Sequence, residues 1–465
     1  MPRTNARAKF SPIRPMITYV SSNRTFLIAV LVLLGTLIVD VSLSNVWDLV
    51  PDHGWGIDIF ILMLIVFGAA QYFIFNYIRI RSKILTKKNK SISSLFILAI
   101  IAQSFSTAFF LAIALQILAL SQYNTLLLTI SSDINFGSAA ILLFLLFLLF
   151  LTWYKRTKKF VMLLYGVSVL LTGATMLIVA ITSTEILSNQ PAWRDATAAF
   201  PNFLNQNTTI QTIQSILGTY SLVSVLLIWT STALLISHYS KRIGKLKFWA
   251  IMSIPIILAV NQYVVVSPII ANNLSSLAGS SLMYGVLLGT TLPAIASGVL
   301  FGLPFWNIAM RLGSNNAGSE HLQLAAWGLI FLLLATSGGV YIAWYPPFGL
   351  YSVLLTTFSS YLFLIGIYSS AISISANDTL RRSIRKLAVE DSKLLRDIGQ
   401  AQMESVLEKK VLSTVRVVSQ EILEDKGVAL SLNDDDAKQY LHDVLREIVK
   451  ITEKRGPGRE PVDAG

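Results

Sequence analysis

Ten stretches of this chain are long and apolar enough to cross a lipid bilayer as helices. A spanning helix needs about 20 apolar residues, because the hydrocarbon core is about 30 Å thick and a helix rises about 1.5 Å per residue. The pattern therefore predicts a polytopic membrane protein. The predicted spans are Thr25–Leu43, Ile57–Ile78, Ser94–Leu120, Ser138–Tyr154, Val161–Thr182, Ile213–Ile236, Phe248–Val266, Leu282–Phe305, Leu322–Trp344 and Phe348–Ala376.

Charged residues are too few to cover a water-exposed surface. They make up 13% of the 465 residues, whereas a soluble domain carries about 25%. This excludes a soluble globular protein, a disordered protein and a coiled-coil fibre. We predict an all-α fold, with a transmembrane bundle of about ten helices over residues 25–376. The apolar segment Tyr123–Ile130 is too short to cross, and we interpret it as part of an outer loop.

Lysine and arginine lie almost entirely in alternate connections between the spans. The N-terminus and the loops after spans two, four, six and eight hold 20 of them, and the other connections hold only Arg194. Basic loops stay on the cytoplasmic side, so both termini are predicted to be cytoplasmic, with residues 1–24 as a basic N-terminal segment of a cell-membrane protein. The net charge of +12 then reflects orientation in the bilayer, and no nucleic-acid partner is expected.

The residues after span ten have a different chemistry. From residue 378 onward, 33 of 88 residues are charged. Apolar residues at steps of three and four predict a cytoplasmic helical tail over 377–454, with a first helix ending near Asp425 and a second beginning near Asn433. Residues 455–465 are predicted to be disordered.

An apolar stripe on the first tail helix has to be buried against something. A coiled coil with a second copy, the second tail helix and a cytoplasmic protein partner are the alternatives. The stripe consists of Leu407, Val411, Val415, Val418 and Ile422.

The predicted spans contain almost no ionisable side chains. Asp40 and Asp58 lie near outer ends, none of the four histidines lies in mid-span, and the chain has no cysteine. Proton relays, haem sites and catalytic centres need such groups, so we predict no catalytic residue, no cofactor and no enzymatic activity. Neutral polar residues could line a solute path, although hydrogen bonds between helices are the favoured interpretation. These residues are Gln71, Gln103, Gln116, Asn261 and Gln262.

The first outer loop gathers Asp48, Asp52, His53 and Asp58. Carboxylate and imidazole groups at this spacing could hold a divalent cation. A solvated acidic loop is the favoured interpretation, so no metal site is predicted.

Span eight carries two G-x-x-x-G patterns and two prolines. The glycines are Gly285, Gly289, Gly298 and Gly302. Such small faces allow another helix to approach closely. The pattern predicts a tightly packed central helix, with a gating hinge as the alternative.

Four segments in the last third of the chain carry a resemblance to a known group of proteins. They are Tyr345–Leu350, Gly366–Ser373, Leu380–Lys386 and Gly399–Met403. Together they resemble uncharacterised multi-pass membrane proteins of archaea. The resemblance implies an archaeal cell membrane, and it implies that span ten and the tail act as one module. It implies no activity and no functional residue.

Three functions from different classes fit the sequence. A sensor or scaffold that couples the bundle to the tail is favoured, because the interior is neutral. A permease or channel for a neutral or weakly polar solute is the alternative, and the Asn261–Gln262 pair supports it. An intramembrane enzyme of the lipid transferase type is the third, and only the first outer loop offers groups for it.

Overall fold

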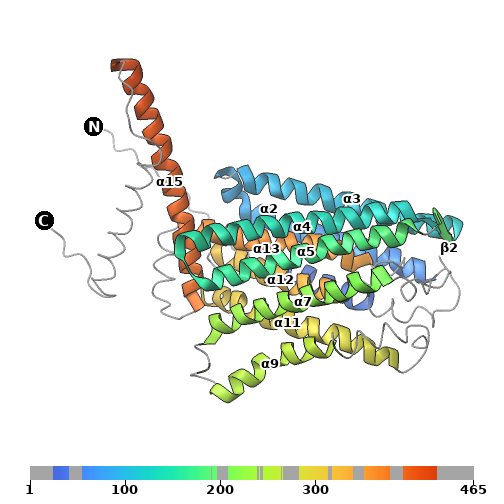
Figure 1. Ribbon diagram of the computed structural model, residues 1–465. Helices are drawn as coiled ribbons and strands as arrows, with labels where there is room; N and C mark the ends of the chain where they lie inside the picture. The colour runs from blue at the N-terminus through green and yellow to red at the C-terminus, as the bar shows by residue number, and fades with distance from the viewer. Residues whose placement is uncertain are drawn as a thin grey trace, which may run out of the picture.

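The computed structural model describes residues 25–40, 55–88, 90–189, 191–195, 208–237, 240, 244–262, 264, 282–312, 317–338, 350–376 and 391–426 (Figure 1). Within these residues, eight helices are long and apolar enough to cross a membrane. The prediction of a multi-pass, all-α membrane bundle is confirmed. The count of ten stays a prediction, because the apolar helix Thr25–Asp40 is shorter and helix α9 has 17 residues.

Each helix of the bundle overlaps one predicted span, although several ends differ by five residues or more, as at the end of α2 and the start of α4. After the helix Thr25–Asp40, the elements are α2 (Trp55–Lys88), α3 (Lys90–Leu120), β1 (Gln122–Asn124), α4 (Thr125–Thr157), α5 (Phe160–Ser188), β2 (Trp193–Asp195), α7 (Thr208–Ile236), α9 (Lys245–Asn261), α11 (Leu282–Leu312), α12 (Ala317–Gly338), α13 (Leu350–Ala376) and α15 (Asp391–Lys426).

The interpretation of Tyr123–Ile130 as an outer loop was wrong. Helix α4 begins at Thr125 and runs without interruption into predicted span four. Asn124 starts it, because its side-chain oxygen accepts a hydrogen bond from the Leu126 amide at 2.9 Å, as N-cap residues do. Strand β1, just before it, pairs antiparallel with β2, and Tyr123 lies opposite Arg194. These contacts fix the N-terminal end of α4 against the connection after α5.

Helix α13 is the centre of the bundle. In its most apolar window, 94% of the residues are buried, against 83% in α12, 61% in α11 and 28% in α3. It contacts α12, α4, α3, α2 and α15. The prediction that span eight is the central helix was therefore wrong. That span is α11, and it exposes Leu292, Val299 and Leu303.

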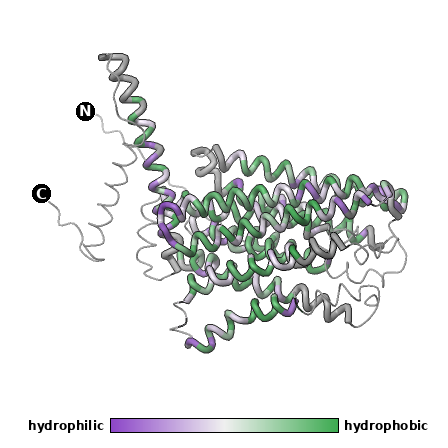
Figure 2. Tube along the Cα trace, viewed as in Figure 1, coloured by the Kyte–Doolittle hydropathy of each residue, from purple (hydrophilic) through white to green (hydrophobic). Residues whose placement is uncertain are grey.

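The outer helices present apolar side chains to their surroundings. Leu98, Phe105 and Leu115 on α3 are about half exposed, as is Ile257 on α9. Figure 2 shows apolar residues along the whole length of the bundle helices, with hydrophilic residues gathered at the ends and along α15. Lipid is the solvent that such a surface requires.

Helices α12 and α13 meet at glycines. A Cβ on Gly328 would lie 2.8 Å from the Cα of Phe363, and a Cβ on Gly366 would lie 2.7 Å from the Cα of Ala325. No side chain fits there, since the obstacle in each case is backbone. The two helix axes therefore approach closely, which increases the van der Waals contact that holds membrane helices together.

Candidate functional site

Two of the polar residues predicted from sequence meet inside the bundle. The Nε2 of Gln71 on α2 donates to the Oε1 of Gln103 on α3 at 3.0 Å. The Nε2 of Gln103 then donates to the carbonyl of Leu354 on α13 at 3.3 Å. Both side chains are buried. The pair links three helices and leaves no open passage between these two side chains.

Asn135 organises a second polar group that the sequence reasoning missed. Its Nδ2 donates to the Oγ of Ser106 at 3.0 Å. Its carbonyl and its Oδ1 accept from the Thr357 hydroxyl at 2.7 and 3.1 Å. The Ser138 hydroxyl lies 3.1 Å from that of Thr357. Helices α3, α4 and α13 are thus joined by satisfied hydrogen bonds at a buried site.

The remaining predicted polar residues have separate surroundings. Gln116 lies near the C-terminal end of α3, where its Oε1 accepts from the Asn124 amide at 3.1 Å. Asn261 is exposed at the end of α9, and Gln262 just beyond it lines a cavity. The structure therefore does not bring the five predicted residues into one path.

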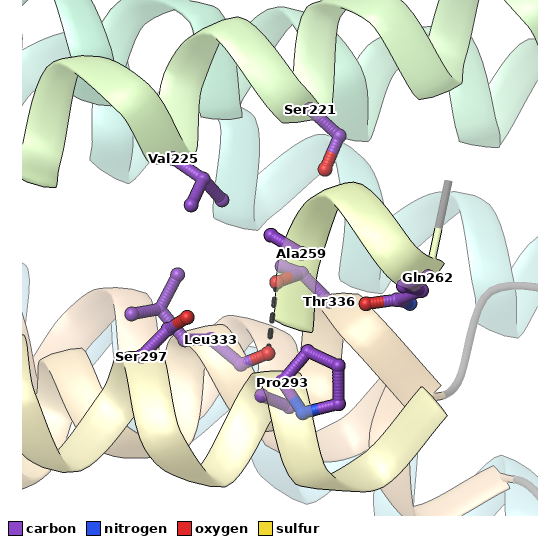
Figure 3. Close-up of a pocket in the computed structure, with 9 residues that line it drawn as sticks. Ser221, Val225, Ala259, Gln262, Pro293, Ser297, Leu333 and Thr336 are labelled. Atoms are coloured by element: carbon purple, nitrogen blue, oxygen red, sulfur yellow. Dashed lines mark hydrogen bonds between the residues drawn. The ribbon is translucent and has the colours of Figure 1, made fainter. Parts of the chain in front are cut away.

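The cavity lies between four helices (Figure 3). Its volume is about 20 Å³, which is enough for one water molecule. The polar lining groups are Ser221 of α7, Gln262 after α9, Ser297 of α11 and Thr336 of α12. The Thr336 hydroxyl donates to the Leu333 carbonyl at 3.2 Å. A molecule in this cavity would meet amide and hydroxyl groups but no charge.

Proline shapes this side of the bundle. Pro293 of α11 lines the cavity, and a proline inside a helix leaves the carbonyl four residues earlier without its usual donor. Helix α9 contains Pro255, and the indole nitrogen of Trp229 on α7 donates to the nearby Met252 carbonyl at 2.6 Å. The proline-containing helix α9 is thus bonded to Trp229 of α7. The proline-containing helix α11 borders the cavity.

The predicted glycine pairs have different neighbours along α11. Gly298 and Gly302 lie against Ile330 of α12, with a Cβ on Gly302 placed 2.9 Å from the Ile330 Cγ1. Gly285 and Gly289 lie in α11, but their surroundings lie outside the described residues.

Ionisable groups inside the helices are more numerous than the sequence reasoning placed there. Asp40 is fully buried, whereas Asp58 is exposed. Asp133 lies within α4, and both of its carboxylate oxygens accept from the Thr184 hydroxyl at 2.9 and 2.8 Å. Glu320 and His321 are buried in the first turn of α12. The errors arose because α4 and α12 begin earlier than predicted.

Of the four candidate ligands in the first outer loop, only Asp58 belongs to the described residues. Asp48, Asp52 and His53 lie outside them. Across the helices and strands that the structure describes, no three histidine, aspartate or glutamate side chains are close enough to share a metal ion.

The base of the tail helix packs directly on the bundle. Ile398 and Ala401 of α15 are buried. Between them, Gly399 lies so close to Ile374 of α13 that a Cβ would stand 3.2 Å from the Ile374 Cβ and would overlap one of its methyl groups. The Trp153 indole nitrogen of α4 also donates to the Oε1 of Gln402 at 3.3 Å. We call Ile398–Gln402 the tail seat.

Six residues beyond Gln402 along α15, an ion pair ties the helix to α4. The guanidinium of Arg156 lies 2.7 Å from the Glu408 carboxylate, and both side chains are roughly 30% exposed (29% and 28%). Beyond this point α15 runs away from the bundle, as Figure 1 shows. Of the predicted stripe, Leu407, Val411 and Val415 are half-buried. Val418 and Ile422 lie in α15, but their surroundings lie outside the description.

The polar groups and the tail seat hold helices together through hydrogen bonds and packing. The buried amides of Gln71, Gln103 and Asn135 are engaged with other protein groups. The tail seat connects the central helix to a projecting one. No known family, curated protein or solved structure matches this chain. The resemblance to archaeal membrane proteins therefore stays a prediction.

Proposed function

We propose that this membrane protein is a non-enzymatic sensor or scaffold that couples its transmembrane bundle to the helical tail. The observation that carries the proposal is the tail seat. Helix α15 rests on α13, and α13 is the helix that contacts the largest share of the bundle. A shift of α13 relative to its neighbours would therefore change the position of α15.

The polar contacts of α13 suggest where such a shift would begin. Thr357 bonds to α4 through Asn135, and the Leu354 carbonyl bonds to α3 through Gln103. Each contact holds α13 at one depth in the membrane. A ligand or a change in the bilayer that favours another arrangement of these helices would be transmitted along α13 to Ile374 and the tail seat.

We place the tail on the cytoplasmic side. Lys155, Arg156, Lys158 and Lys159 lie at the end of the bundle where α15 is seated, and all four are exposed. Clustered basic residues mark the cytoplasmic ends of spans. The projecting part of α15, with Val417 exposed, is then available to a second copy or to a cytoplasmic protein.

A spectroscopic experiment tests the coupling. The chain has no cysteine, so cysteines introduced at Thr152 of α4 and Val406 of α15 can carry the only two spin labels. The distribution of distances between them reports how much of α15 is docked. We expect Thr357→Val to change the ratio of docked to undocked tail about threefold, since a hydrogen bond between membrane helices contributes about 0.6 kcal/mol.

A matched variant separates coupling from general destabilisation. Thr172→Val removes a buried hydroxyl of α5 that lies 2.7 Å from the Ser224 hydroxyl of α7, away from α13. We expect it to leave the distance distribution unchanged. Equal responses in the two variants, or no response to Thr357→Val, would contradict the coupling.

The cavity favours a second candidate function, the binding or passage of a small neutral polar solute. Its lining of Ser221, Gln262 and Ser297 beside a proline-interrupted helix is the kind of environment in which transporters hold substrates. Proteoliposome swelling with urea, glycerol and formamide tests it. The Gln262→Leu variant should slow swelling with at least one of these solutes, and permeability equal to empty liposomes would exclude this function.

A further inference from the structure

The turn between α4 and α5 concentrates positive charge in a fixed geometry. Lys155, Arg156, Lys158 and Lys159 fall within five residues, and all are exposed. Lys158 takes a left-handed backbone conformation (φ 55°), and its amide donates to the Tyr154 carbonyl at 2.7 Å. Helix α5 begins at Phe160, directly after the turn. The backbone therefore holds the four cations close together.

The surroundings of this turn place it at the level of lipid headgroups. It follows one apolar span and precedes another. Trp153, three residues before Arg156, is buried and donates to Gln402 of α15, so the turn also lies beside the tail seat. Among the described residues, Glu408 is the acid paired with this turn, through Arg156. Lys155, Lys158 and Lys159 are exposed and have no acidic partner in the described part of the chain.

We propose that the turn of residues 155–159 binds anionic lipid phosphates, and that these compete with Glu408 for Arg156. This inference rests on the coupling role proposed above and names the membrane component that would act on it. When lipid phosphate takes Arg156, Glu408 is released, and α15 rotates away from α4 about the tail seat. The bilayer's anionic lipid content then sets the angle of the projecting helix.

The strengths of the two interactions make the competition effective. A basic residue near an anionic surface strengthens binding about fivefold. A partly exposed ion pair such as Arg156–Glu408 contributes fivefold at most. Four cations held together therefore favour the lipid, whereas the apolar tail seat at Ile398, Gly399 and Ala401 is not affected by lipid charge and remains as the pivot.

The movement would be large enough to measure. Helix α15 continues for 27 residues beyond Gly399, which is about 40 Å at 1.5 Å per residue. A rotation of about 20° would move its far end by about 14 Å. Spin labels at Thr152 and Val417 report this angle, in full-length protein in nanodiscs of phosphatidylcholine alone or with about one third phosphatidylglycerol.

We expect the label distance to increase by at least about 5 Å in the anionic discs. Glu408→Gln should produce the same longer distance in phosphatidylcholine alone, because it removes the carboxylate that pairs with Arg156 and holds α15 against α4. The triple variant Lys155→Gln, Lys158→Gln, Lys159→Gln keeps the ion pair and should lose the response to phosphatidylglycerol. Lys245→Gln with Lys247→Gln removes two exposed cations at the start of α9 and should retain the response.

The outcomes separate this inference from the coupling on which it rests. Equal distances in the two lipid compositions, or an unchanged response in the triple variant, would overturn the lipid competition. If Thr357→Val still shifts the docked fraction of the tail, the coupling survives such a result. Inorganic phosphate added to phosphatidylcholine discs distinguishes the sources, since a free anion that reproduced the shift would contradict a lipid site.

Discussion

The contact between α12 and α13 and the region around α9 and α11 show two ways of packing helices in one bundle. At Gly328 and Gly366, backbone meets backbone with no room for a methyl group. Around Pro255 and Pro293, α9 and α11 expose apolar side chains to lipid, and Pro293 borders a cavity of about 20 Å³. Glycine removes the side chain that would keep helices apart, whereas proline removes a hydrogen bond and adds bulk. The first region should therefore be rigid and the second adaptable.

The largest expected effect comes from adding one carbon to the tighter region. Gly366→Ala places a Cβ against the backbone of Ala325, so α12 and α13 have to separate, at a cost of about 3 kcal/mol or more. Gly137→Ala makes the same change on α4, where no atom lies within 4 Å, and should be neutral or slightly stabilising. Thermal unfolding in detergent, followed by tryptophan fluorescence, measures both. Similar losses in the two variants would contradict the comparison.

Replacing the buried amide of Asn135, which bonds to α13, should lower stability more than replacing the amide of Gln262 beside the cavity. Both effects should be smaller than that of Gly366→Ala. Asn135→Leu breaks buried hydrogen bonds to Ser106 and Thr357, and we expect a loss of about 1–2 kcal/mol. Gln262→Leu changes a half-buried amide beside the cavity and should stay within about 0.5 kcal/mol of the wild type. The same unfolding measurement compares them. A greater loss from Gln262→Leu would reverse our assignment of which region is rigid.

Gly302→Ala tests the boundary between the regions. Its new Cβ would lie 2.9 Å from Ile330 Cγ1 and 3.1 Å from Ile330 Cδ1. The two nearest atoms belong to a side chain, and the nearest backbone atom, the Ala326 carbonyl oxygen, lies at 3.2 Å, farther than the backbone that opposes Gly366. We expect a loss of about 1 kcal/mol, clearly below that of Gly366→Ala in the same unfolding assay. A loss as great as that of Gly366→Ala would show that α11 packs as rigidly as α13.

The smallest effect is expected from Pro293→Ala. The alanine restores an amide that can bond to the carbonyl one turn earlier, while it removes a ring from the cavity wall. These changes oppose each other, so stability should change by less than about 1 kcal/mol. A cysteine at Ser297 of the same cavity reports access, through its rate of reaction with a small thiol reagent. We expect that rate to change more than the stability, and a stability loss above that of Asn135→Leu would refute the prediction.

The sequence was sufficient to predict the bundle because hydropathy is a local property. Each apolar run indicates a helix by itself, and the first tail helix ends within one residue of its predicted end at Asp425. The start of α4 was missed because Ser131, Asn135 and Gly137 interrupt the apolar run. The Asn135 amide is satisfied by Ser106 of α3 and Thr357 of α13, and such packing between helices is a property that hydropathy does not contain.

The central position of α13 and the tail seat could not be predicted from the sequence for a similar reason. The pattern of Gly298 and Gly302 in α11 drew attention to spacing within one helix. The tightest contacts instead join Gly328 of one helix to Phe363 of another, and Gly399 to Ile374. Single glycines facing a partner carry no periodic signal. Their role is visible only when the register between helices is known.

The burial of α12 and α13 has a consequence for biosynthesis. These two helices are the last of the bundle to leave the ribosome, and they are less apolar than α4. A helix rich in serine and threonine enters lipid less readily by itself. The earlier helices would therefore wait in the membrane with a lipid-filled gap at their centre until α12 and α13 insert as a pair. Helix α15 follows α12 and α13 in the chain and rests on α13. It can therefore dock only after α13 has packed into the bundle, so docking of the tail would report that the bundle has assembled.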